Sequence, residues 1–283
     1  MQSRQSETKF DAAYQGHRGA FSEDAACQLL GSDIRLLPCD MLEDVFDAVD
    51  RGEAQFGVVP VENSLSGSIH ECYDLLFQHD VKIVGEIVCR IEHALIAPPG
   101  VAFGDVRKAL SHPVALAQCE KFFRRNPQIH PVSVFDTAGA VENIMRDGSR
   151  DSAAVAGRRA AEIYGGVILA DGIQDDEQNY TRFLLISTFA SAAARTLAGE
   201  CKTSIVFRIP NEPGALCRAL HQFADRGIDL AKIESRPLRG SRFEYLFYLD
   251  LVGRADSPAV SDALTELRRQ SVSLRVLGTY PRC

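Results

Sequence analysis

The sequence predicts an α/β protein with a large region of alternating strands and helices, followed by a small ferredoxin-like unit. In the large region, residues 9–190, short apolar runs alternate with amphipathic stretches, a pattern typical of parallel sheets covered by helices on both faces. In residues 202–283 the order changes to β-α-β-β-α-β. The chain has 283 residues, more than one compact core usually holds. We therefore expect separate domains joined by a linker at residues 191–201.

The first half of the large region contains two predicted strands and three predicted helices. Residues 10–14 predict a strand, and the continuous apolar run 56–61 is typical of a strand buried in a parallel sheet. Residues 22–30 and 41–51 predict helices, because the first opens with acidic residues and the second has apolar residues at helical spacing. Ser68-Ile-His-Glu71 matches a capping box and predicts a third helix, which extends to about Gln78.

The second half repeats this alternation. The predicted strands are residues 82–88, 94–97, 108–110, 132–135, 153–156, 167–170 and 183–188. The predicted helices run from Pro113 towards Asn126 and over residues 137–146 and 158–164. The region forms either one domain or two lobes with a cleft between them, and ligands usually bind where the carboxyl ends of strands meet such a cleft.

The tail follows a weakly patterned segment of small residues, 190–199, which predicts a linker. Its predicted strands are residues 203–209, 228–234, 244–252 and 273–277. Its predicted helices are residues 215–225 and 258–269. A turn at residues 211–214 opens the first of these helices, so free N–H groups are available there for a carboxylate.

Composition argues against several classes of protein. The net charge is −7 with both signs interspersed, which does not indicate a nucleic-acid or membrane surface. The polar first eight residues show no secretory signal, and no run approaches the roughly 20 apolar residues of a membrane helix. We expect a cytoplasmic protein with reduced cysteines, although a plastid enzyme that has lost its transit peptide would look the same. Metal-ligand spacings and nucleotide-binding glycine motifs are missing, so we expect neither a metal nor a cofactor.

Five polar clusters stand at strand ends, where core residues would be expected to stop. They are residues 14–22, 60–68, 111–119, 136–137 and 179–183. Each has an ordinary alternative: a glycine turn, a helix cap or an exposed turn before a strand. Cys119 fits a core position better than a nucleophile, because no paired histidine is evident. Five such clusters in one α/β region together predict a binding site.

These clusters, in this order, resemble the prephenate dehydratase family, including its arogenate-using members. The matching segments are Tyr14-Gln-Gly with Gly19-Ala-Phe-Ser22, Pro60-Val-Glu-Asn-Ser64 with Ser66-Gly67, Ser111-His-Pro113 with Gln118-Cys119, and Asn179-Tyr-Thr-Arg-Phe183. In the tail, Gly214-Ala-Leu and Glu234-Ser-Arg-Pro237 resemble the two phenylalanine-binding signatures of that family's ACT domain. Two departures are mild: Leu65 stands where a serine is frequent, and Cys217 where a valine is common.

The resemblance implies two α/β lobes similar to type II periplasmic binding proteins, with the active site between them. It implies a carbon–oxygen lyase that converts prephenate to phenylpyruvate with loss of water and carbon dioxide, without cofactor or metal. It further implies a homodimer or homotetramer that is inhibited by L-phenylalanine. Because of the tail motifs, we expect phenylalanine to bind between two ACT domains. The expected effector contacts are Asn211, Gly214, Ala215, Leu216, Glu234, Ser235 and Arg236.

The resemblance also assigns roles in the catalytic region. Thr181 matches the family's essential threonine, and we expect it to orient the leaving hydroxyl. Glu62, Asn63, Ser111 and Gln118 match its other catalytic or substrate-contacting positions, and Glu62 is a candidate acid. We expect Arg182 to anchor a substrate carboxylate, since guanidinium binds carboxylate through two hydrogen bonds. The further candidate substrate contacts are Phe183, Thr137, Ser66 and His112.

Three other functions compete with this hypothesis. A solute-binding protein of the same two-lobed fold would normally carry a signal sequence, which is not seen. A non-catalytic amino-acid sensor acting on genes would show a basic patch, and an NAD-linked dehydrogenase would show a glycine fingerprint. Prephenate is the expected substrate, and arogenate is the alternative that the sequence does not exclude. They differ by a keto against an amino group, and only Ser187 is suggested as a residue that distinguishes them.

Overall fold

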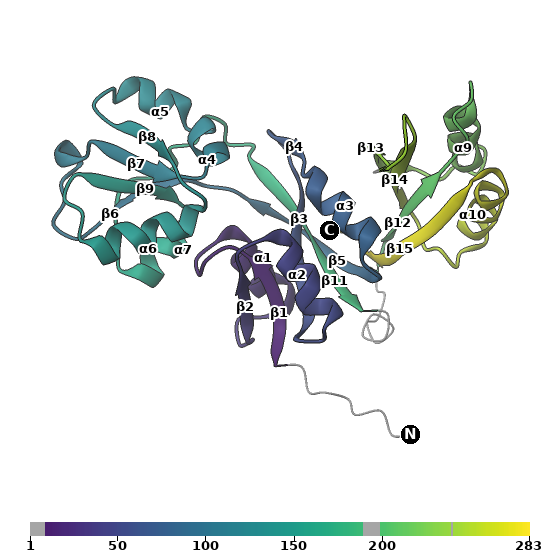
Figure 1. Ribbon diagram of the computed structural model, residues 1–283, viewed down its shortest axis with the longest axis horizontal. Helices are drawn as coiled ribbons and strands as arrows, with labels where there is room; N and C mark the ends of the chain where they lie inside the picture. The colour runs from purple at the N-terminus through teal and green to yellow at the C-terminus, as the bar shows by residue number, and fades with distance from the viewer. Residues whose placement is uncertain (1–8, 189–198, 239) are drawn as a thin grey trace.

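The computed structural model describes residues 9–188, 199–238 and 240–283, whose strands form three sheets. Figure 1 shows three bodies in a row, with lobe 1 (residues 10–90 and 180–188) between lobe 2 (residues 94–170) and the C-terminal domain (residues 201–281). The predicted two-lobed α/β region and the ferredoxin-like tail are therefore confirmed. Most of the predicted linker at 191–201 lies outside the described residues.

Lobe 1 is built on a mixed sheet with the strand order β2-β1-β3-β11-β5, and β4 pairs with β3. Its strands are β1 (Phe10–Gln15), β2 (Leu36–Cys39), β3 (Ala54–Asn63), β4 (Gly67–Ser68), β5 (Val81–Arg90) and β11 (Tyr180–Thr188). Its helices are α1 (Phe21–Leu30), α2 (Leu42–Asp50) and α3 (His70–Gln78). The expected parallel pairing holds among β1, β2 and β3 but fails for β11. Strand β11 returns from lobe 2 and enters the sheet at the cleft, so it runs antiparallel to both β3 and β5.

Lobe 2 contains a second mixed sheet with the order β10-β6-β9-β7-β8. Its strands are β6 (Ala94–Ala97), β7 (Lys108–Ser111), β8 (His130–Ser133), β9 (Ser152–Ala156) and β10 (Val167–Ala170). Its helices are η1 (Phe103–Asp105), α4 (Pro113–Ala117), α5 (Glu120–Arg125), α6 (Thr137–Asp147) and α7 (Arg158–Tyr164). The single helix predicted from Pro113 is thus two short helices, which are separated at Gln118 and Cys119.

The C-terminal domain has the order β13-β14-β12-β15. It comprises β12 (Cys201–Arg208), α9 (Ala215–Ala224), β13 (Leu230–Pro237), β14 (Tyr245–Val252), α10 (Pro258–Gln270) and β15 (Ser273–Pro281). One apolar cluster joins α9 and α10 to the sheet, with Phe207, Phe223 and Leu267 fully buried.

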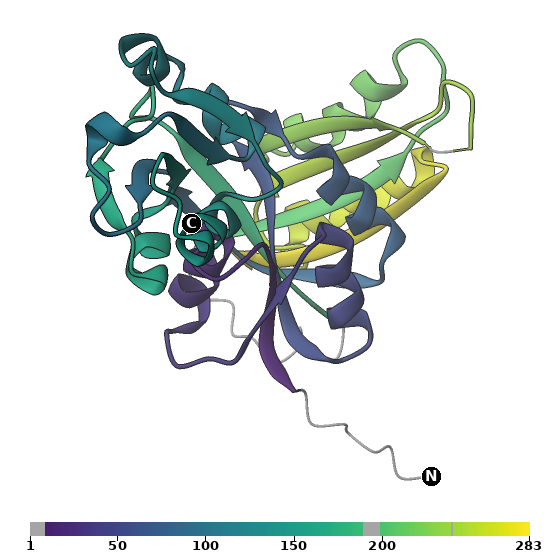
Figure 2. The same ribbon diagram turned by 60° about the vertical axis from the view of Figure 1, so that its left-hand side comes forward.

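The C-terminal domain packs against lobe 1 through the sheet face that its helices leave free. In both views its sheet, coloured green to yellow, borders lobe 1 (Figures 1 and 2). Leu246, Tyr248 and Leu277 belong to the same buried cluster as Val59 and Leu76 of lobe 1. Gly278 of β15 lies so close to β5 that a Cβ there would stand 2.0 Å from the carbonyl oxygen of Ile83. The apolar core of lobe 1 is therefore completed by the C-terminal domain.

Two local predictions near this junction are wrong. Ser68 does not cap α3, whose N-cap is Ile69; the Ser68 hydroxyl instead donates to Glu234 of the C-terminal domain. Strand β11 begins at Tyr180, three residues before the predicted start, because its first residues pair with β3 and β5. Thr181 and Arg182 consequently lie within a strand and point to opposite faces of the sheet.

Candidate active site

A cavity of about 460 Å³ lies between the two lobes. Strands β3 and β11 of lobe 1 supply Asn63, Thr181 and Phe183, and lobe 2 supplies Gln118 and Thr137. Ser66 and His112 also line it. Seven residues that the sequence nominated, from four of its five polar clusters, thus surround one cavity.

The alternation of side chains along two paired strands determines which residues reach this cavity. Thr181 pairs with Asn63 and Arg182 pairs with Glu62 in the antiparallel ladder of β11 and β3. Successive side chains of a strand point to opposite faces. Asn63 and Thr181 therefore face the cavity together, and Glu62 and Arg182 both face the C-terminal domain.

Arg182 does not meet the expectation that it binds a substrate carboxylate. Its guanidinium is nearly buried and donates to Glu86 at 2.7 Å, to Asp250 at 2.6 Å and to the Tyr280 hydroxyl at 3.0 Å. Glu62 lies at the same junction, where it accepts a hydrogen bond of 2.8 Å from Lys232. We correct both assignments: neither side chain lines the cavity, because each sits on the far face of the strand that carries the site.

Ser111 also fails to reach the cavity. It is fully buried, and its hydroxyl donates to the carbonyl of Val155 at 2.6 Å. That hydrogen bond joins β7 to β9 at the strand end from which His112 and α4 continue. The structure gives Ser111 a supporting position behind the cavity wall, and its expected direct contact with substrate is not seen.

A hydrogen-bonded group of amides forms part of the cavity wall, with Asn63 and Gln118 at the surface and Asn179 behind them. The Asn63 amide donates to Thr181 Oγ1 at 3.0 Å and to Asn179 Oδ1 at 2.7 Å. The Asn179 amide donates to Gln118 Oε1 at 2.9 Å, and Gln118 Nε2 lies 3.3 Å from Ser66 Oγ. Asn179 is fully buried and Thr181 is 8% exposed, so the group is largely withdrawn from water. A hydroxyl held by a buried amide network is a defined hydrogen-bonding point in the cavity.

Three helices of at least two turns begin at the cavity. They are α1, represented by Phe21 and Ser22, α3, represented by Ile69 and Glu71, and α6, represented by Asp136 and Thr137. The first N–H groups of a helix have no partner within it and carry a partial positive charge, which favours bound anions. No lysine or arginine lines the cavity in the described part of the chain. Helix N-termini are therefore the cavity's source of positive potential for an anionic ligand.

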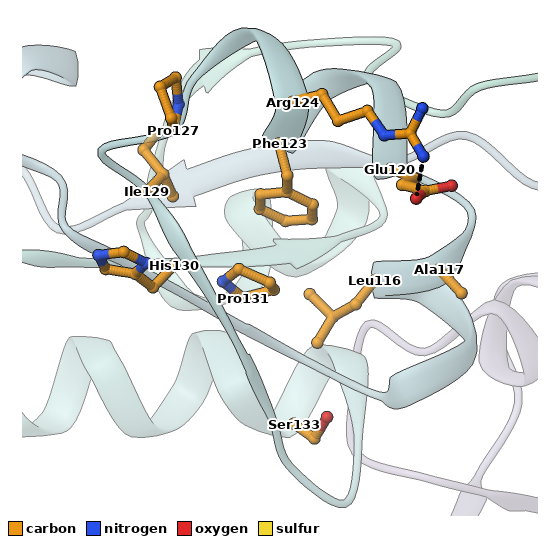
Figure 3. Close-up of a pocket in the computed structure, with 10 residues that line it drawn as sticks. All are labelled: Leu116, Ala117, Glu120, Phe123, Arg124, Pro127, Ile129, His130, Pro131 and Ser133. Atoms are coloured by element: carbon orange, nitrogen blue, oxygen red, sulfur yellow. Dashed lines mark hydrogen bonds and ion pairs between the residues drawn. The ribbon is translucent and has the colours of Figure 1, made fainter.

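A second hollow, of about 600 Å³, lies on lobe 2 beside the edge strand β8 (Figure 3). Leu116, Phe123 and Pro131 form its apolar floor, and the Arg124–Glu120 ion pair closes one side. None of the residues nominated from the sequence lines it. The cavity between the lobes is consequently the candidate active site.

Comparison with known families agrees with this geometry. Residues 12–191 match the family model for prephenate dehydratase, and residues 203–269 match that of the ACT domain. The first match covers both lobes and every residue of the interlobe cavity. The chain belongs to the prephenate dehydratase family. Its catalytic region is accordingly that of a carbon–oxygen lyase, and its C-terminal domain is an ACT domain.

Three proteins are similar to this chain over almost its whole length. A chloroplastic arogenate dehydratase/prephenate dehydratase 2 of Arabidopsis thaliana is 44% identical over 95% of this chain and 72% of its own length. The crystal structure of a prephenate dehydratase from Arthrobacter aurescens in complex with L-Phe is 33% identical, with a TM-score of 0.86 over 96% of this chain and 90% of that one. A structure described as a quorum quenching acylase, GqqA, is 36% identical, with a TM-score of 0.85 over 96% of this chain and 98% of that one.

Sequence reasoning missed two buried members of this dehydratase site. His93, which follows β5 at the crossing between the lobes, is 2% exposed and lines the cavity. Asn179 belongs to the Asn179-Tyr-Thr-Arg-Phe183 motif, but the motif alone predicts no role for it. A polar residue next to apolar strand residues was the available signal for His93. The sequence predicts Asp136 as a helix cap. It does cap α6 by accepting from the Gly139 N–H, but it also lines the cavity and contacts His17.

The expected effector residues of the ACT domain fall into two groups. Asn211, Gly214, Ala215 and Leu216 lie at the turn and first residues of α9, where Gly214 has φ +80°. Ser235 is exposed on β13. Glu234 and Arg236, the neighbours of Ser235 in β13, form the second group and point to the opposite face of the sheet, towards lobe 1. Glu234 accepts from Ser68, and Arg236 pairs with Asp74 at 3.0 Å. Within one chain, these last two side chains hold the ACT domain to lobe 1.

None of the helices that the structure describes is long and apolar enough to cross a membrane.

Proposed function

We propose that this chain converts prephenate to phenylpyruvate, releasing water and carbon dioxide, and that the reaction takes place in the interlobe cavity. The single observation that carries this proposal is the convergence of Asn63, Gln118 and Thr181 at that cavity. The three come from segments far apart in the sequence, and each matches a functional position implied by the family resemblance. Membership of the prephenate dehydratase family supports the same reaction.

The chemistry of the substrate fits the walls of the cavity. Prephenate carries two carboxylates, and the N-termini of α1, α3 and α6 offer N–H groups to anions there. Phe183, Phe21 and Ile91 supply apolar surface for the ring. Loss of carbon dioxide provides the electron pair that expels the hydroxyl, and the ring becomes aromatic, so the reaction requires no strong base.

Thr181 is the proposed contact for the leaving hydroxyl. Expulsion of a hydroxyl is the demanding event, and hydrogen bonding that strengthens as negative charge develops on that oxygen lowers its barrier. Thr181 lines the cavity beside Asn63, and its hydroxyl oxygen accepts a hydrogen bond from the Asn63 amide. Ser66, His112 and Thr137 remain proposed substrate contacts because they line the same cavity.

Arogenate is the alternative substrate. It carries an ammonium group where prephenate has a keto group, and carboxylates attract ammonium groups. Asp40, Glu71 and Asp136 line the cavity, and this acidic character supports turnover of arogenate as well. Ser187, suggested from the sequence, is buried and donates to the carbonyl of Gln55, so we no longer propose it as the discriminating residue.

For regulation, we propose that L-phenylalanine binds the ACT domain and inhibits the enzyme. The complex of the Arthrobacter aurescens relative with L-Phe and the sequence motifs Gly214-Ala-Leu and Glu234-Ser-Arg-Pro237 support this. We further propose a homodimer or homotetramer that places the effector between two ACT domains. We propose a cytoplasmic location or, for a processed form, a plastid one.

The proposal is tested by assaying purified protein with prephenate and with arogenate, each with and without L-phenylalanine. We expect phenylpyruvate from prephenate and a lower rate when phenylalanine is added. Lack of phenylpyruvate from prephenate would overturn the proposed reaction, and turnover of arogenate alone would favour the alternative substrate. An assay of N-acyl amide hydrolysis belongs in the same series, because one similar structure is described as an acylase. Among the described residues no cavity hydroxyl is hydrogen-bonded to a histidine, so we expect no hydrolysis above background.

A further inference from the structure

The direction of every hydrogen bond in the amide network is fixed from one end by the backbone. The N–H groups of Leu65 and Ser66 lie 3.0 and 2.9 Å from Asn63 Oδ1. Backbone N–H groups only donate, so this atom of Asn63 must be the acceptor oxygen. The other end of the Asn63 amide is therefore the NH₂ group, which can only donate.

The same logic determines the role of Thr181. Asn63 Nδ2 donates to Thr181 Oγ1 at 3.0 Å, so the threonine oxygen is an acceptor in this bond. Thr181 Oγ1 makes no second hydrogen bond to a described residue. Its hydroxyl hydrogen is thus free to donate, and Thr181 lines the cavity. The network leaves a hydrogen-bond donor at the point where the leaving hydroxyl is proposed to bind.

In the other direction the network ends at His93. Asn179 Oδ1 accepts from Asn63, so Asn179 Nδ2 donates to Gln118 Oε1 at 2.9 Å. Gln118 Nε2 lies within 3.4 Å of Asn63 Oδ1, an acceptor. The remaining neighbour of Gln118 Oε1 is His93 Nε2, also at 2.9 Å. An acceptor oxygen needs a donor opposite it, so His93 Nε2 must carry a hydrogen.

We propose that His93 is a positioning residue for the dehydratase reaction: its Nε2–H fixes the amide of Gln118, and the network then holds the Thr181 hydroxyl as a donor towards the leaving group. This inference rests on the proposed function. With Nε2 protonated in a neutral ring, Nδ1 is a bare acceptor. If the Gln118 side-chain amide were flipped by 180°, its oxygen would face Asn63 Oδ1, and the two acceptor oxygens would repel each other.

The surroundings of His93 suit this role. The His93 ring packs edge-on against Phe21, the backbone N–H of His93 donates to Gln174, and its backbone carbonyl accepts from Ile173. Burial lowers the pKa of His93 below its usual value, which keeps the ring neutral. Nδ1 is buried and has no hydrogen-bond partner among the described residues. Leaving Nδ1 unsatisfied costs free energy that an apolar side chain would avoid, so the hydrogen bond of Nε2 is the feature that distinguishes a histidine here from an apolar residue.

Two substitutions test the role through activity. In His93→Gln the side-chain amide can place an NH₂ group where Nε2 lies, whereas His93→Leu keeps apolar bulk and removes the donor. We expect His93→Leu to lower kcat about 10- to 100-fold with KM changed less than about threefold, because a misplaced catalytic group loses rate more than binding. We expect His93→Gln to recover at least about half of the lost activity on a logarithmic scale. Circular dichroism and thermal unfolding of both variants check that the fold is kept.

A second measurement reads the tautomer directly. Nitrogen-15 NMR of histidine-labelled full-length protein distinguishes a protonated from a bare ring nitrogen, and the His93 signals are those missing from the His93→Gln spectrum. We expect Nε2 protonated and Nδ1 bare at pH 7. In Gln118→Leu, which removes the acceptor, we expect the Nε2–H signal to move while the other six histidines keep their shifts.

The outcomes separate this inference from the proposed function. An inactive wild-type protein would refute the proposed reaction, and the NMR result would still decide the tautomer. An active wild-type protein with a His93→Leu variant of near-normal kcat would overturn the positioning role. A Nδ1-protonated ring would overturn it as well. If His93→Gln were as impaired as His93→Leu, the Nε2–H donor would not be the property that matters, and the inference would fail.

Discussion

Arg182 of β11 and Asp250 of β14 form an ion pair of 2.6 Å that joins the catalytic lobe to the ACT domain. Arg182 directly follows Thr181, whose side chain faces the cavity on the opposite side of the same strand. Burial alone would lower the pKa of Arg182, but the surrounding groups, Asp250 foremost, raise it well above its usual value. A single strand thus presents one residue to the active site and its neighbour to the regulatory domain.

Replacing Arg182 should uncouple the two domains. Arg182→Met leaves the carboxylates of Glu86 and Asp250 without the guanidinium between them, and loss of one partner of a buried pair costs about 3–5 kcal/mol. We expect a loss of that order in urea unfolding of the full chain, a weaker response to phenylalanine, and a KM for substrate within about threefold of wild type. Arg254→Met, at an exposed ion pair with Asp256, is the control and should unfold nearly like wild type. A large rise in KM with unchanged stability would restore Arg182 as a substrate anchor.

Removing the Thr181 hydroxyl should abolish most of the activity without affecting the fold. Thr181→Ala deletes the donor at the cavity, and we expect kcat to fall about 10²- to 10⁴-fold. Thr181→Ser keeps a hydroxyl and should recover a substantial part of this rate. Steady-state kinetics with thermal unfolding of each variant measures both effects. Near-normal turnover by Thr181→Ala would remove this residue from the mechanism.

Gly278 should be intolerant of any side chain. A Cβ there would lie 2.0 Å from the carbonyl oxygen of Ile83, which belongs to the backbone and cannot move aside cheaply. We expect Gly278→Ala to loosen the contact of β15 with β5, seen as faster limited proteolysis between the lobes and the ACT domain and as reduced inhibition by phenylalanine. Gly104→Ala is the matched control, since nothing lies within 4 Å of its Cβ position. Equal behaviour of the two variants would show that the domain contact is not close in solution.

Stability should fall with rising pH in a window set by Asp24. Burial raises the pKa of this α1 carboxyl from 3.8 to about 6, although the positive charge of Arg159 acts to lower it. The folded state then holds the proton more tightly than the unfolded state between about pH 4 and 6, so unfolding becomes easier as pH rises through that window. Asp24→Asn should flatten the slope there and raise the free energy of unfolding at pH 7 by about 1–2 kcal/mol, after allowance for partial exposure.

Asp11 provides the opposite case. Its hydrogen bonds with Arg35 lower the pKa of this carboxyl, so its contribution is present at neutral pH and lost on acidification. Asp11→Asn should therefore reduce stability at pH 7, whereas Asp24→Asn increases it. Urea unfolding at pH 4, 5, 6 and 7 tests both signs. A variant of Asp24 that is less stable than wild type at pH 7 would show that its ion pair with Arg159 outweighs the cost of burial.

Local patterns were sufficient to predict most of the elements. The alternation of apolar and amphipathic stretches identified both lobes, and the switch to β-α-β-β-α-β identified the C-terminal unit. Helix boundaries at residues 158–164 agree with the structure. The strand β2 (Leu36–Cys39) was missed because it is short and contains a proline, and the start of β11 was placed too late because Tyr180-Thr-Arg is polar for a strand. Non-local pairing with β3 and β5 decided that boundary.

The sequence by itself determined the family, the order of domains and the chemical groups available to the site. It did not determine which of those groups meet. Asn63 and Glu62, like Thr181 and Arg182, are neighbours in one motif, and a strand sends neighbours to opposite faces. The cavity covers one of these faces and the ACT domain covers the other. Only the tertiary structure decides which face is which, because that depends on packing between segments more than a hundred residues apart along the chain. His93 likewise lines the cavity because of how the two lobes pack, which its local sequence does not reveal.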